Sequence, residues 1–105
     1  MKIKIKDLTN EQLDLAVARI EFVLMPEHYP AYHADMRATG LLLEHLKIEL
    51  GYCDEWYATV YDKELDSLPG YSGNTRIGKG VGPTWCIAVL RAYLNAKLKS
   101  DEVEL

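Results

Sequence analysis

The sequence predicts an α+β fold in which a small antiparallel sheet packs against two main helices. Three observations support this class. Residues 2–6 alternate lysine with isoleucine, residues 56–61 combine aromatic and β-branched side chains, and two longer segments repeat apolar residues at helical spacing. The chain has 105 residues, of which 49% are hydrophobic, so we expect one globular domain over residues 1–105.

The N-terminal part predicts a short strand and then a helix. In Lys2–Lys6 the isoleucines would face the core and the lysines water, as at the edge of a sheet. Thr9 and Gln12 have the spacing of a capping box, and an apolar stripe with helical period follows them. We therefore predict a helix over about residues 10–24 that ends before Pro26.

The middle of the chain predicts a loop, a short helix and a β-hairpin. Residues 25–40 contain two prolines and no sustained periodicity, which is typical of a long ordered loop. Residues 41–50 fit a short helix followed by a strand. Residues 56–61 are the strongest predicted strand, so the turn of the hairpin would lie within residues 51–55.

The C-terminal part predicts a loop and a long helix. Residues 62–82 are polar and punctuated by glycine, which indicates a loop. Thr84 has the position of an N-cap, and the apolar residues after it predict a helix over about residues 85–99. Residues 101–105 are mostly acidic, and we expect this tail to fray.

The charge is distributed unevenly along the chain. The whole chain has a net charge of −4, but residues 67–100 contain no Asp or Glu and carry +5, which leaves −9 for the rest. This acid-free window contains a glycine-rich segment that leads into the predicted helix N-terminus. Backbone N–H groups, the helix dipole and the cations Arg76 and Lys79 would converge there, a combination that favours an anion.

We therefore predict a ligand site at this glycine-rich segment. The glycines would let a ligand approach the backbone closely, Thr84 would offer a hydroxyl group, and nearby aromatic rings could stack on a nucleotide base. The alternatives are a solvated surface loop and, for Arg91, a solvated position on the helix surface. The predicted ligand-binding residues are Tyr32, Tyr71, Arg76, Gly78, Lys79, Gly80, Gly82, Thr84, Trp85 and Arg91.

Other site chemistries have weaker support. Residues 73–80 approach the phosphate-loop pattern G-x-x-x-x-G-K-[ST], but Gly80 stands where a hydroxyl side chain must ligate Mg²⁺. His28 and His33 lie close together in sequence, but Pro30 between them prevents the helical spacing of zinc ligands. We expect no catalytic residue, no metal and no cofactor.

Composition also limits the partners and the compartment. A net charge of −4 disfavours general binding to nucleic acid phosphates. Cys53 and Cys86 lack the spacing of a metal site, and neither a signal peptide nor a long apolar run is visible. We therefore expect a reduced cytoplasmic protein that does not enter the membrane. As part of the functional hypothesis below, we also expect a homo-oligomer.

Several short stretches of the chain carry motifs that are typical of one protein family. They are Met1–Lys6, Leu8–Thr9, Leu13–Ala18, Asp35–Met36, Gly40, Leu42–Glu44, Trp56–Ala58, Gly82–Thr84, Arg91–Tyr93 and Asp101–Glu104. In these stretches the chain resembles a family of small tailed-phage and prophage proteins that includes NinX-like proteins. It departs from the family at Met36, which replaces a tryptophan, and between Tyr61 and Gly82. The resemblance implies phage origin and a shared fold, and it brings no catalytic residues.

These observations lead to one main functional hypothesis. The chain would be a non-enzymatic, phage-encoded binding protein that sequesters an anionic small molecule in the host cytoplasm, such as a nucleotide-derived signal of host defence. Sequestration needs no catalytic group. Two alternatives stay open, an accessory factor whose basic face docks on an acidic host or phage protein, and a hydrolase of the same signal.

Overall fold

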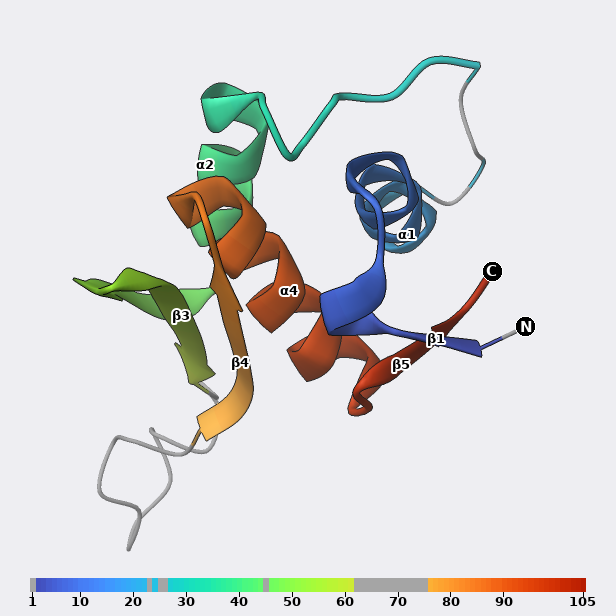
Figure 1. The fold of residues 1–105 in the computed structure, drawn as a ribbon. Coiled ribbons are helices and arrows are strands. Elements are labelled where there is room, and N and C mark those ends of the chain that lie inside the picture. Colours follow the sequence, from blue (N-terminus) through green and yellow to red (C-terminus); the bar gives the residue numbers. More distant parts are fainter. Residues whose placement is uncertain (1, 23, 25–26, 45, 62–75) are drawn as a thin grey trace, which may run out of the picture.

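The computed structural model describes residues 2–22, 24, 27–44, 46–61 and 76–105. Within these residues the predicted α+β class is confirmed, with three α-helices and two small antiparallel sheets packed against α4 (Figure 1). The elements in chain order are β1 (Lys2–Lys4), the 3-10 turn η1 (Ile5–Asp7), α1 (Asn10–Glu21), α2 (Met36–Glu44), β2 (Lys47–Cys53), β3 (Glu55–Tyr61), β4 (Arg76–Gly82), α4 (Trp85–Leu98) and β5 (Glu102–Glu104).

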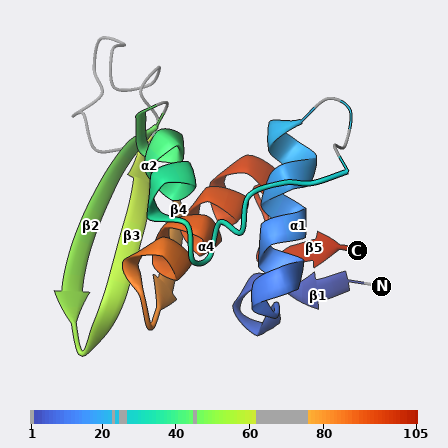
Figure 2. The same cartoon turned by 90° about the horizontal axis from the view of Figure 1, so that it is seen from above.

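Helix α4 is the centre of the molecule. Its predicted N-cap is confirmed, because the Thr84 hydroxyl oxygen accepts a hydrogen bond from the Ile87 N–H at 3.3 Å. The helix ends at Leu98, and its C-cap Lys99 adopts a left-handed conformation with φ 52°. The three-stranded sheet lies on one side of α4, and α1 with the β1–β5 pair lies on the other (Figures 1 and 2).

The larger sheet has the strand order β2-β3-β4, and all its pairs are antiparallel. The predicted hairpin between β2 and β3 is confirmed, and it turns at Asp54, which has φ 65°. Strand β4 is a correction, because residues 76–82 were expected within a loop. The glycines that suggested a loop alternate along a strand, and Gly78, Gly80 and Gly82 form its buried face.

These glycines allow β4 to approach α4 closely. A Cβ atom on Gly80 would lie 2.4 Å from the Ala92 nitrogen and 2.5 Å from the Ala88 oxygen. A Cβ on Gly78 would lie 2.7 Å from backbone atoms of α4. The strand and the helix are therefore in backbone contact through small residues on both sides. The structure thus gives these glycines a packing role, and their role in ligand approach stays a prediction.

The second sheet joins the two ends of the described chain. Strand β1 pairs with β5, with Ile3 opposite Val103 and lysines opposite glutamates at both flanking positions. Val103 is buried, and the Ile5 N–H donates to the Asp101 oxygen at 2.7 Å. The expectation that residues 101–105 fray is wrong, because β1 offers a pairing edge and opposite charges to the acidic tail.

The remaining helices begin at side-chain caps. The capping box of Thr9 and Gln12 is confirmed, and α1 ends at Glu21, three residues before the predicted end. Helix α2 begins at Met36, inside the predicted loop, because the Asp35 carboxylate accepts hydrogen bonds from the N–H groups of the next turn. Among the described residues, no helix is long and apolar enough to cross a membrane.

The core consists of two clusters on opposite sides of α4. The first includes Leu13 and Val17 of α1 with Leu90 and Tyr93 of α4. The second lies under the sheet and contains Val60 together with the alanines of α4. Tyr93 was expected in the core and is only 2% exposed, whereas Trp56 is half-buried at the edge of the second cluster.

Candidate functional site

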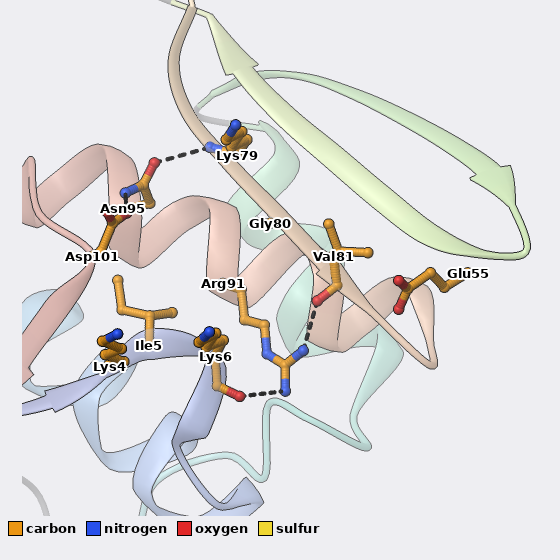
Figure 3. Close-up of a pocket in the computed structure, with 10 residues that line it drawn as sticks. All are labelled: Lys4, Ile5, Lys6, Glu55, Lys79, Gly80, Val81, Arg91, Asn95 and Asp101. Atoms are coloured by element: carbon orange, nitrogen blue, oxygen red, sulfur yellow. Dashed lines mark hydrogen bonds between the residues drawn. The ribbon is translucent and has the colours of Figure 1, made fainter.

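A pocket of about 590 Å³ lies between β4, α4 and the N-terminal segment (Figure 3). Five of the elements, together with the turn before β5, contribute to its wall. The lining residues are Lys4, Ile5, Lys6, Glu55, Lys79, Gly80, Val81, Arg91, Asn95 and Asp101. Four of these side chains are cationic and two are acidic, so the pocket is positively charged within an acidic protein.

Three lysines line this pocket from two sides. Lys79 comes from β4, and Figure 3 shows Lys4 and Lys6 on the opposite side. None of the three ammonium groups forms a hydrogen bond or an ion pair with a described residue. Their donors are therefore available to an anion, and their combined field would attract one.

Arg91 spans the base of the pocket. Its Nη1 donates to the Val81 oxygen of β4 at 2.6 Å, and its Nη2 donates to the Lys6 oxygen of η1 at 3.4 Å (Figure 3). Its Nε is buried and has no acceptor among the described residues. Arg91 is thus a half-buried link between two segments of the wall, and the alternative of a solvated surface arginine is wrong.

Asn95 lies one helical turn after Arg91 and forms a second link. Its Oδ1 accepts a hydrogen bond from the Lys79 N–H at 3.1 Å, and its Nδ2 donates to the Ser100 oxygen at 3.0 Å. Nδ2 also lies 3.1 Å from Asp101 Oδ1. Sequence reasoning missed Asn95, although a signal was present: two polar side chains four residues apart in an apolar helix share one face.

The structure distributes the predicted site residues over several places. Lys79, Gly80 and Arg91 line the main pocket. Arg76 and Gly78 line a smaller neighbouring pocket of about 380 Å³, which also includes Lys79 and Asn95. The two pockets share Lys79 and Asn95, so the predicted residues and the newly found Asn95 form one continuous region beside β4.

The other predicted residues lie away from the main pocket. Gly82 packs against Ile87, and Thr84 caps α4. Trp85 is partly buried against the second core cluster, and Tyr32 is a core residue with 5% exposure. Tyr71 lies outside the described residues. No aromatic residue of the described chain lines the main pocket, so the expected base stacking has no partner there.

A separate polar pair joins α1 to the segment before α2. The buried Asp14 carboxylate accepts the His33 backbone N–H at 2.8 Å, and its other oxygen lies 2.6 Å from His33 Nδ1. The pair orients the imidazole and secures residues 27–35 to the helix. Sequence reasoning missed it, although an aspartate beside Leu13 on the apolar stripe of α1 was a signal. Within the described ranges, no three His, Cys, Asp or Glu residues are placed to hold a metal ion.

Three groups in the core favour their neutral forms. Burial raises the pKa of Tyr93, and its hydrogen bond to Glu21 at 2.5 Å raises it further. Burial also raises the pKa of Tyr32 and the pKa of the Cys86 thiol. A raised thiol pKa is the opposite of what an activated nucleophile requires, so Cys86 is a packing residue.

No protein-family model matches this chain, and a search of curated proteins finds no match either. The site is therefore interpreted from its own geometry. That geometry defines a small α+β protein with a lysine-rich pocket beside β4, the outer strand of the larger sheet.

Proposed function

We propose that this protein is a non-enzymatic binding protein for an anionic small molecule, which it holds between β4 and the N-terminal segment. The observation that carries the proposal is a set of three ammonium groups around one pocket, those of Lys4, Lys6 and Lys79, which pair with no residue that the structure describes. A volume of about 590 Å³ is within the usual range of ligand pockets.

The lining suggests how such a ligand would lie. A phosphate or carboxylate group would accept hydrogen bonds from the lysines, whose ammonium groups suit multiply charged oxygens. Figure 3 shows Glu55 at the other end of the pocket, where it could accept a hydrogen bond from a ligand hydroxyl or amine. Ile5, beside Lys4 and Lys6, and Val81, nearer to Glu55, offer apolar contact (Figure 3). A sugar phosphate, including the ribose phosphate part of a nucleotide, has this order of groups.

The biological setting follows from the resemblance to NinX-like phage proteins. A phage-encoded protein would act in the host cytoplasm, and a nucleotide-derived signal of host defence is then the first ligand class to test. Sequestration of such a signal requires affinity and no chemical step.

Thermal unfolding and calorimetry with a series of ligands test the proposal. Orthophosphate, AMP, ADP-ribose and cyclic nucleotides are compared with adenosine, which has no phosphate. A ligand at about one hundred times its Kd should stabilise the native state by about 2.7 kcal/mol, and added salt should weaken its binding. If none of the anions changes the melting temperature at millimolar concentration, the proposal is wrong.

Charge-neutralising variants locate the binding site. Replacing both Lys6→Gln and Lys79→Gln should weaken binding at least about tenfold, since each lost charge-assisted hydrogen bond contributes more than 1 kcal/mol. Lys2→Gln is the matched control, because Lys2 lies on the same strand as Lys4 but lines a different pocket. Equal losses in both variants would contradict the assigned site.

Two further readouts separate the alternatives that the sequence left open. Recovery of intact ligand after denaturation supports sequestration, whereas a converted product indicates a hydrolase. Binding of an acidic protein that depends on Lys6 and Lys79, with no small anion bound, would instead make this basic face a docking surface.

A further inference from the structure

Strand β2 forms an open edge of the three-stranded sheet. It pairs with β3 along all seven of its residues without a register shift, and no described strand lies on its other side (Figure 2). Leu50 and Tyr52 on this strand are 38% and 64% exposed. The strand contains no proline, and its lysine stands at its first position only. These are the features of an edge that can accept another strand.

The hydrogen bonds of β4 reveal which residues of β2 point to the open edge. The Lys79 N–H donates to Asn95, so it points away from β3, and Lys79 with its partner Thr59 forms a non-hydrogen-bonded pair. The backbone groups of Thr59 therefore point toward β2, where Thr59 faces Glu49.

The same alternation continues along β2. Because Glu49 exchanges its hydrogen bonds with β3, its neighbours have their N–H and C=O groups on the opposite side. The residues whose backbone groups face the open edge are thus Ile48, Leu50 and Tyr52. The side chains of these three residues lie on the face of the sheet that carries Ala58 and Val60, which are buried on the α4 side.

We propose that the open edge of β2 pairs with β2 of a second copy of this chain, in antiparallel orientation and with Leu50 on the two-fold axis. In this register Leu50 faces Leu50 of the second copy, and Ile48 faces Tyr52. Every residue with free backbone groups then meets another such residue, and each pair exchanges two hydrogen bonds. The two sheets become one continuous sheet with both α4 helices on the same face.

Charge and side-chain packing select this register over its neighbours. A register centred on Glu49 would place two Glu49 carboxylates opposite each other, which is unfavourable. A register centred on Gly51 would align fewer residues with free backbone groups and leave Ile48 without a partner. The register centred on Leu50 opposes no like charges, and it brings together the exposed apolar side chains of Leu50 and Tyr52 from both copies.

Sedimentation of the full chain over a range of concentrations tests the self-pairing. We expect a reversible dimer whose affinity falls at least about tenfold in Leu50→Lys, because two lysines would then meet at the axis. Leu41→Lys is the matched control, since Leu41 is also exposed, at 52%, but lies on α2. The control variant should dimerise as the wild-type chain does.

Two further measurements do not depend on the folding of the lysine variant. In a Cys53→Ser background, Leu50→Cys should cross-link two copies under mild oxidation, since directly opposed Cα atoms are about 5.5 Å apart. Leu41→Cys in the same background should cross-link far less. Amide exchange should also slow with rising protein concentration at Leu50 and Tyr52, and not at Glu49.

A monomer at all concentrations would overturn the proposal, and so would a dimer that Leu50→Lys leaves unchanged. Pairing of β2 with a strand of another protein would show as a monomer in pure solution and would equally exclude self-pairing. The proposal is independent of the anion pocket, because that pocket lies beside β4 at the opposite edge of the sheet.

Discussion

The two edges of the three-stranded sheet differ in whether side chains of α4 form hydrogen bonds with the outer backbone groups. At the β4 edge, two side chains of α4 form hydrogen bonds with backbone groups that face away from β3. Asn95 accepts a hydrogen bond from the Lys79 N–H, and Arg91 donates one to the Val81 oxygen. At the β2 edge, the described residues place no such side chain. The comparison shows that a helix protects a strand edge where the strand lies close enough for the polar side chains of that helix to reach its backbone.

The reason for this difference is the size of the residues between strand and helix. Gly78 and Gly80 let β4 contact the α4 backbone, so side chains on the flank of the helix reach over the strand edge. Strand β2 lies farther across the sheet from β4 (Figure 2), and it carries Ile48 and Leu50 at the positions that correspond to these glycines. The β4 edge therefore lines the lysine-rich pocket, whereas no described strand covers the β2 edge.

The largest effect is expected from breaking the close contact of β4 with α4. Gly80→Ala would place a Cβ at 2.4 Å from a backbone atom of α4, which neither element can avoid without moving. We expect a loss of about 3 kcal/mol in the free energy of unfolding, measured by urea titration.

A second glycine provides the control for this measurement. Gly40 on α2 has no atom within 4 Å of an added Cβ, so Gly40→Ala should stabilise the chain by about 0.5–1 kcal/mol. If Gly80→Ala were tolerated as well as Gly40→Ala, the packing role assigned to the β4 glycines would be wrong.

Removing the Arg91 hydrogen bonds at the β4 edge should have the next largest effect on the free energy of unfolding. Arg91→Met keeps much of the side-chain volume but removes two hydrogen bonds from a guanidinium group, so we expect a loss of about 2 kcal/mol. Arg19→Met is the control, because exposed Arg19 forms one long bond of 3.4 Å to the Glu104 oxygen. Equal unfolding free energies for the two variants would show that Arg91 does not join the wall segments.

Removing the Asn95 hydrogen bonds at the same edge should lower the free energy of unfolding by less. Asn95→Ala removes neutral hydrogen bonds near the surface, and we expect a loss of about 1 kcal/mol. The more specific readout is amide exchange of Lys79, which should accelerate because its acceptor is gone. Asn10→Ala at the exposed start of α1 should leave the exchange of Lys79 unchanged. An unchanged Lys79 rate in Asn95→Ala would show that this link does not protect the edge.

The smallest effect is expected from a glycine on β2. A Cβ on Gly51 would also meet an atom at 2.1 Å, but that atom belongs to the Tyr57 ring, which is 39% exposed and can turn away. Gly51→Ala should therefore change the free energy of unfolding by less than about 1 kcal/mol. A loss as large as that of Gly80→Ala would mean that the two edges are equally constrained.

Local signals predicted much of the fold. Thr9 with Gln12 and Thr84 each defined a helix start, and the confirmed hairpin follows from β-branched and aromatic residues around a short polar turn. Part of the site was also predictable, because the charge pattern singled out Lys79 and Arg91, and both line the pocket. Lys4 and Lys6 were interpreted only as solvent-facing strand residues, since nothing in the sequence indicates that they lie across from β4.

By itself, then, the sequence determined the α+β class, the helix starts at Thr9 and Thr84, the hairpin, and the excess of cations near β4. These features depend on residues a few positions apart, whose preferences act within a single element. Tertiary structure alone decided that the glycines form a buried strand, that the acidic tail pairs with β1, and that Arg91 and Asn95 close one sheet edge. Such outcomes depend on contacts between distant segments, where burial and hydrogen-bond partners outweigh the local preferences of glycine and of acidic residues.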